Sequence, residues 1–192
     1  MSVLLRLWRT QKIKKDNEAI FCGGKLKTES CTGIIIYKGT LYIRKQTMLR
    51  KRNSFHEAGH AVCLMSIGFI PEKVQIFTNG CGKTQCKVKL DDFSADLISL
   101  AGTVAEHMYS ADCIEVIDAV AAGLVPPGAD GDFAQLHDAR PPKIAAKMRY
   151  LYDLLAEHWY WVSIVANELT AKRSLNRKDI IRIKQQLQYY RL

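Results

Sequence analysis

Two histidines and a glutamate in the stretch NSFHEAGHAV constrain the fold more than any other feature of this 192-residue chain. His56 and His60 are four residues apart, so on a helix, which we expect over about residues 54–68, both imidazoles point to one side. Two histidines so placed can bind one Zn²⁺, and Glu57 then lies beside the open coordination position, where it can accept a proton from a metal-bound water. The pattern therefore predicts a metal centre suited to peptide-bond hydrolysis.

The same stretch has a plainer interpretation. Ser54 and Glu57 have the spacing of an N-terminal capping box, in which case the helix carries two surface histidines and no metal. Glu57 cannot both cap a helix and act as a base, so the two interpretations exclude each other.

A catalytic zinc ion usually has three protein ligands, and the motif supplies only two. The longer pattern H-E-x-x-H-x-x-G-x-x-H is not followed, because Cys63 and Ser66 stand where its glycine and third histidine would be. Glu72 follows Pro71 at the start of an expected strand, which is an awkward position for a ligand. Spacing does not choose among the other candidates, which are Glu106, His107, Asp130, Asp132 and His137.

Positive charge is concentrated at the N-terminal end. Residues 1–52 hold 13 Lys and Arg against 3 Asp and Glu, a net +10, whereas residues 53–192 hold 15 against 16, a net −1. We therefore expect a basic N-terminal extension over 1–52 and a separate domain over 53–192. The extension could contact nucleic acid or an anionic membrane surface, or it could be a solvated face with no partner.

The pattern of apolar and turn residues predicts a mainly α (α+β) fold with small β hairpins. Hairpins are expected over residues 32–46 and 72–90, the second with alternating apolar residues at Val74 and Ile76 and at Val88 and Leu90. Besides the helix that carries the motif, the expected helices cover residues 94–109, 130–139, 143–172 and 177–191, the last capped by Ser174 or Asn176.

Several classes of protein are excluded or disfavoured. No stretch approaches the roughly 18 apolar residues of a membrane-spanning helix, and the first residues make a poor secretory signal, so we expect a cytoplasmic protein with no integral membrane segment. The six cysteines contain no C-x-x-C pair and are expected to be reduced thiols. The sequence GCGKT is not a phosphate loop, because Phe77 stands where that motif requires a glycine, and we expect no ATP binding.

Four blocks in order resemble the peptidase domain of the FtsH family of AAA zinc metalloproteases. FHEAGHAV is similar to that family's zinc helix, and EKVQIF with GKTQCKVKL to the strand pair after it. SLAGTVAEHMY is similar to its LAGRAAEE helix, and GADGDFAQLHDA to its GAxNDLxxAT segment. The final helices are also similar, so the resemblance covers about residues 53–185 and implies a helical FtsH-type zinc metallopeptidase domain.

Residue by residue, the resemblance implies His56 and His60 as zinc ligands, Glu57 as the general base, and Asp132 as the third ligand. Asp130 and Glu106 are candidates to orient a ligand imidazole through its other nitrogen, and Asp130 could instead cap its helix. His137 is expected beside the site or packed at the surface.

The chain also departs from the family pattern. Family members carry an ATPase module and assemble into hexameric rings, but this sequence has no ATPase module and no preceding membrane helices. We therefore expect an ATP-independent zinc endopeptidase for flexible or small polypeptide substrates, with homo-oligomerisation as an open expectation. The alternative is a nucleic-acid-associated regulatory protein that has a basic N-terminal arm and a structural or single-substrate metal site.

Overall fold

The computed structural model describes residues 34–37, 40–43, 45–77 and 81–189, and the chain divides into two compact units, Met1–Tyr42 and Ile43–Leu192. Two short strands, β1 (Ile34–Tyr37) and β2 (Thr40–Ile43), pair with each other, as expected for a hairpin over 32–46. Most of the basic extension lies outside the described residues. The second unit contains every residue predicted for the metal site.

The helix that carries the motif is longer than expected. Helix α1 runs from Lys45 to Ser66, so it begins well before residue 54, and the basic run at 50–52 lies inside it. The capping-box interpretation is wrong, because Ser54 lies within the helix, where its hydroxyl donates to the Arg50 carbonyl oxygen at 2.9 Å and accepts from Thr170 at 3.0 Å. The helix ends close to the predicted position, before Gly68 with its φ of +93°.

The rest of this unit is mainly helical, with a three-stranded antiparallel sheet in the order β4-β3-β5. This arrangement confirms the expected fold class. The elements after α1 are β3 (Lys73–Ile76), β4 (Gly82–Gln85), α2 (Asp92–Ser110), α3 (Cys113–Ala121), α4 (Asp130–Phe133), α5 (Pro141–Glu157), α6 (Trp159–Lys172), β5 (Ser174–Asn176) and α7 (Arg177–Tyr189).

Several boundaries differ from the sequence predictions. The single helix expected over 143–172 is two helices, which separate at His158, and α4 is shorter than the helix expected over 130–139. Helix α3 and strand β5 were not predicted. The second arm of the hairpin over 72–90 lies at Gly82–Gln85, and Val88 is exposed outside it. The cap of α7 is confirmed at Asn176, whose side-chain oxygen accepts from the backbone N–H groups of residues 178 and 179.

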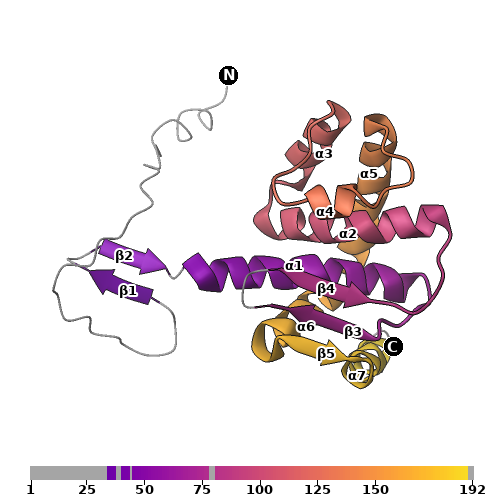
Figure 1. Ribbon diagram of the computed structural model, residues 1–192. Helices are drawn as coiled ribbons and strands as arrows, with labels where there is room; N and C mark the ends of the chain where they lie inside the picture. The colour runs from indigo at the N-terminus through magenta and orange to yellow at the C-terminus, as the bar shows by residue number, and fades with distance from the viewer. Residues whose placement is uncertain (1–33, 38–39, 44, 78–80, 190–192) are drawn as a thin grey trace. The chain divides into compact units, whose positions relative to one another are not determined.

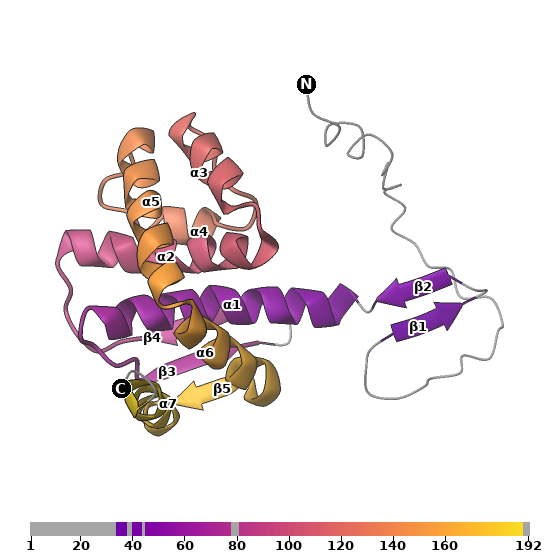
Figure 2. The same cartoon turned by 180° about the vertical axis from the view of Figure 1, so that it is seen from behind.

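Helix α1 lies between two layers (Figures 1 and 2). Helix α2 packs on one side of it, and α6 with strands β3 and β4 packs on the other, while α3 and α5 lie beyond α2. Helices α1 and α2 approach closely, since a β-carbon at Gly59 would lie only 2.3 Å from the Ala101 carbonyl oxygen. Phe55 joins three helices by stacking on Tyr109 of α2 and Trp159 of α6, with ring centroids 4.2 and 5.5 Å away. The motif is thereby placed in the middle of the unit.

Candidate metal centre

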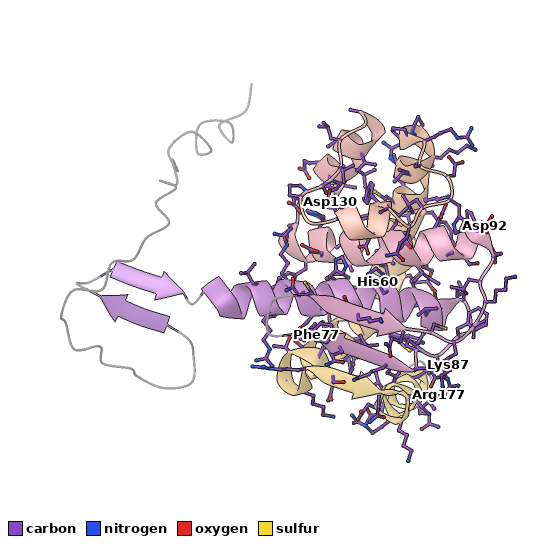
Figure 3. All side chains as sticks on the ribbon, viewed as in Figure 1. His60, Phe77, Lys87, Asp92, Asp130 and Arg177 are labelled. Atoms are coloured by element: carbon purple, nitrogen blue, oxygen red, sulfur yellow. The ribbon has the colours of Figure 1, made fainter. Side chains whose placement is uncertain are left out.

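The two histidines of α1 meet at their Nε2 atoms. His56 Nε2 and His60 Nε2 are 3.1 Å apart, as the four-residue spacing predicted. His60 is buried, with 7% of its surface exposed, and its label lies in the middle of the second unit in Figure 3. Both atoms face α2 and α4, because Gly102 of α2 and the Asp132 carboxylate of α4 lie close to them.

The other nitrogen of each ring is held by helix α2. His56 Nδ1 donates to Glu106 Oε2 at 2.8 Å, and His60 Nδ1 donates to the Ile98 carbonyl oxygen at 2.6 Å. Both acceptors lack a proton to give, so each Nδ1 carries a hydrogen, and Nε2 is the nitrogen of each ring that can lose its proton to a metal ion. The Nε2 lone pairs are then left to bind a cation, and the rings cannot turn without losing these bonds.

Asp132 on α4 completes a cluster of three donors. Its Oδ2 lies 3.1 Å from His56 Nε2, and its Oδ1 lies 3.9 Å from His60 Nε2. Thr103 of α2 donates a long hydrogen bond of 3.5 Å to the same carboxylate. The fold thus brings to both Nε2 atoms the aspartate that the resemblance implied and that spacing alone left open.

The other candidates for the third position lie elsewhere. Glu106 contacts the outer nitrogen of His56, as expected for an orienting group, and forms an ion pair with Arg52. His107 is bonded to Asp112 at 2.8 Å. Asp130 is exposed at the start of α4 (Figure 3), where Ala129 holds the cap position. His137 is half-exposed, and its Nδ1 is 3.0 Å from the buried carboxylate of Asp96.

Glu57 lies beside the imidazole pair but is turned toward strand β4. The Thr84 hydroxyl donates to Glu57 Oε2 at 2.7 Å. Gly82 leaves room for the other oxygen, since a β-carbon there would lie 2.2 Å from Oε1. Donor atoms of His56, Glu57 and His60 all lie within 4.8 Å of one another, so this cluster can hold a metal ion. Asp132 is a second carboxylate beside the same imidazoles, with its Oδ2 3.1 Å from His56 Nε2, whereas Glu57 is bonded to Thr84.

The electrostatics of the cluster favour a shared cation. Burial lowers the pKa of His56, but its bonds to Asp132 and Glu106 outweigh burial and raise this pKa to about 10. Burial and the nearby charge of His56 lower the pKa of His60. Burial raises the pKa of Asp132, yet its bond to His56 gives a net lowering. Two imidazole lone pairs and a carboxylate so close together need a positive charge between them, which a proton or a metal ion can supply.

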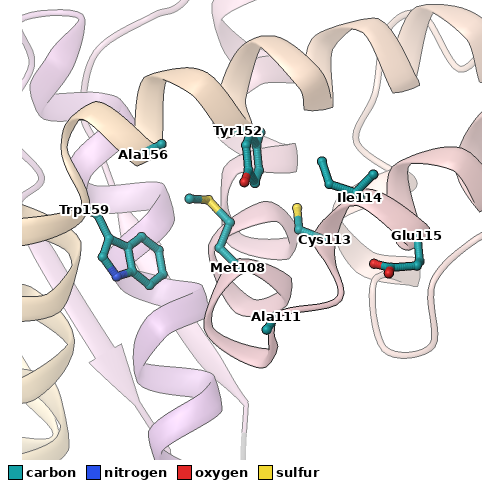
Figure 4. Close-up of a pocket in the computed structure, with 8 residues that line it drawn as sticks. All are labelled: Met108, Ala111, Cys113, Ile114, Glu115, Tyr152, Ala156 and Trp159. Carbon is teal, nitrogen blue, oxygen red and sulfur yellow. The ribbon is translucent and has the colours of Figure 1, made fainter. Parts of the chain in front are cut away.

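The cluster lines a cleft of about 590 Å³. Strand β4 borders one side through Gly82 and Thr84, and the segment around α4 contributes Gly128, Gly131 and Gln135. A second cavity of about 550 Å³, between α2, α3, α5 and α6, contains none of the predicted metal-site residues (Figure 4). The thiol of Cys113 in that cavity is buried, which raises its pKa to about 12 and keeps it protonated.

Comparison with known proteins adds no assignment, since no protein-family model and no curated protein matches the chain. Within the described part of the chain, no helix combines the length and apolar character needed to cross a membrane. The predicted contacts of residues 1–52 with nucleic acid or an anionic surface remain predictions.

Sequence reasoning missed the residues that hold the predicted ones in place. Ile98 acts through its backbone carbonyl, which no side-chain pattern reveals. Thr103 lies three residues before Glu106 on α2, and this helical spacing was an available signal. Thr84 lies in an expected strand, but its contact with Glu57 depends on how the sheet packs against α1. Arg52 was counted only as part of a basic run.

Proposed function

We propose that this chain is a zinc-dependent, ATP-independent endopeptidase of the FtsH peptidase type. The observation that carries the proposal is the convergence of His56 Nε2, His60 Nε2 and the Asp132 carboxylate, with the Glu57 carboxylate beside them in an open cleft. Two imidazoles and one carboxylate suit zinc in hydrolases. They also suit iron in oxygenases, but a glutamate next to the first histidine of such a helix favours hydrolysis.

The residues around the donors have distinct tasks in this proposal. His56, His60 and Asp132 would hold the zinc ion, which lowers the pKa of a water molecule and polarises the carbonyl group of the substrate. Glu57 takes a proton from the attacking water and passes it to the leaving amine. Thr84 donates to Oε2 of Glu57, so Oε1 is the oxygen that would accept the proton in this proposal.

The surroundings of the site support an extended polypeptide as substrate. Strand β4 is at the edge of the sheet order β4-β3-β5, and its residues Gly82, Lys83 and Thr84 line the cleft. An extended peptide can add to such an edge through main-chain hydrogen bonds, which bind many sequences alike. No phosphate loop accompanies the site in the sequence, so the proposed substrates are flexible or small polypeptides that need no unfolding by this chain.

Metal analysis together with a cleavage assay tests the proposal. The purified wild-type chain is expected to contain one zinc ion and to cleave an unfolded polypeptide such as casein. Glu57→Gln should keep the zinc ion and lose cleavage by at least about a hundredfold, since general-base catalysis typically contributes this much. The matched control is Glu115→Gln at the second cavity, which should cleave like the wild type. Undiminished cleavage by Glu57→Gln would refute the mechanism.

A further inference from the structure

Asp96 of α2 is a buried carboxylate outside the donor cluster. Only 1% of its surface is exposed, yet it has four polar partners. Oδ1 accepts from the His137 backbone N–H at 2.8 Å and lies 3.0 Å from His137 Nδ1, and Oδ2 accepts from the Asp138 backbone N–H at 3.3 Å. Lys147 of α5 forms an ion pair with Oδ2. A buried carboxylate with this many hydrogen bonds restrains the chain segments that carry its partners.

The partners of Asp96 belong to the segment that presents Asp132. His137 and Asp138 follow α4 by only a few residues, so their bonds tie the end of this segment to α2. Helix α2 also supplies Ile98 and Glu106, which hold the two imidazoles. Helix α2 therefore positions all three donors. It holds His56 and His60 through their Nδ1 atoms, and it holds Asp132 through the backbone that follows α4.

Polar contacts hold Asp132 only weakly from α2, because the bond from Thr103 to its carboxylate is long at 3.5 Å. Helix α4 has four residues, none of which is fully buried, although Phe133 and the nearby Leu136 pack against the core. On the other side of α4 the chain is held by Ala129, which is buried. The segment is thus held by apolar contacts at Ala129, Phe133 and Leu136 and by the buried polar anchor at Asp96.

We propose that Asp96, neutralised by Lys147, is a positioning residue that holds the Asp132 carboxylate opposite His56 and His60. The proposal rests on the proposed metal site and assigns Asp96 no contact with substrate. Loss of the bonds from Asp96 would release the end of the segment, and zinc affinity would fall because Asp132 must then be ordered on binding. The effect of removing an outer-sphere partner is typically about 10- to 100-fold in metal affinity.

Zinc affinity, measured by competition with a chromophoric chelator, tests this inference in four proteins. These are the wild type, Asp96→Asn, the double variant Asp96→Asn/Lys147→Met, and the control Asp92→Asn. The Asp96→Asn substitution alone would leave the ammonium group of Lys147 unpaired, and the double variant removes this group. We therefore expect the double variant to be more stable than Asp96→Asn but to bind zinc no more tightly. Asp92 is an exposed residue of the same helix, and its Oδ1 is 3.5 Å from His137 Nε2. Asp92→Asn therefore shows the effect of removing a negative charge beside His137 without removing the buried bonds of Asp96.

The expected result is zinc affinity lowered about tenfold or more in the double variant, with wild-type affinity in Asp92→Asn. Backbone amide exchange over residues 130–138 should quicken in the double variant, whereas exchange in α1 stays slow. A double variant that binds zinc within twofold of the wild type would overturn the inference, even where Asp96→Asn alone fails to fold. A wild-type chain that binds zinc but cleaves no polypeptide would refute the proposed peptidase function. The zinc affinities of the variants would still test the positioning role of Asp96.

Discussion

Gly102 of α2 faces His60 of α1 so closely that a β-carbon on residue 102 would lie 2.3 Å from His60 Nε2. The same β-carbon would lie 2.6 Å from His56 Nε2. Glycine at this position therefore provides the space in which both imidazoles approach each other, and it accounts for a glycine inside a long helix, where alanine would be more stable.

Gly102→Ala is expected to abolish zinc binding while the chain still folds. The added methyl group meets the tips of two side chains rather than backbone, so the imidazoles can move aside and the two donors separate. Zinc content after dialysis and the circular dichroism spectrum measure the two effects. Gly131→Ala is the matched control, because a β-carbon there meets no atom within 4 Å. A zinc-containing Gly102→Ala chain would contradict this account.

Gly82→Ala should have the opposite pattern, with zinc kept and cleavage lost. Its β-carbon would meet the Glu57 carboxylate 2.2 Å from Oε1, so the base is displaced and the imidazoles are left alone. We expect cleavage at least about a hundredfold slower, by loss of general-base catalysis. Steady-state cleavage of a peptide by the zinc-loaded variant measures this. Full activity would show that Glu57 acts from another position.

Glu106→Gln is expected to weaken zinc binding about 10- to 100-fold without removing it. The glutamine can still accept from His56 Nδ1, but it lacks the charge that makes the imidazole a stronger donor and that pairs with Arg52. Competition with a chelator gives the affinity. The comparison variant is Glu157→Gln at the end of α5, for which wild-type affinity is expected, and equal affinities in the two variants would argue against the role of Glu106.

Acid should reduce stability partly through Asp96. Burial raises its pKa, but bonds from Lys147 and His137 outweigh burial and lower this pKa to about 2. Because this pKa is below the unfolded value of about 3.9, the stabilisation is complete only above about pH 5 and is lost as pH falls toward 2. The difference in free energy of unfolding between the wild type and Asp96→Asn should therefore narrow between about pH 5 and pH 2. Urea unfolding at several pH values tests this, and a constant difference would exclude it.

Residues 43–192 are expected to fold and bind zinc without the first 42 residues. This boundary follows the compact units and leaves α1 whole, whereas a cut at residue 52 would remove its first two turns. Binding to duplex DNA, if the full chain shows it, should have a steep salt dependence and disappear in the shortened chain. Thermal unfolding and a salt titration measure the two effects. A shortened chain that keeps its DNA affinity would place that affinity in the second unit.

The parts of the fold that sequence could predict are those encoded locally. The spacing of His56 and His60 is a property of one helix, and it predicted their meeting correctly. Asp132 lies 72 residues after His60, and five candidates fitted the spacing equally well until the packing of α2 and α4 separated them. The break at His158 was invisible because the apolar stripe of Leu155 and Val162 continues through it.

The separation of His60 and Asp132 along the chain determines when during folding the donor cluster can assemble. The Nε2 atoms of His56 and His60 come together as soon as α1 forms. The Asp132 carboxylate joins them only after the segment that contains α4 has docked on α2. A copy with α1 formed but α4 not yet docked would hold only the two imidazoles and would bind a metal ion more weakly than the complete cluster. If the chain is the peptidase we propose, its proteolytic activity would appear only after folding is complete. A newly synthesised copy would therefore not cleave other proteins before it has folded.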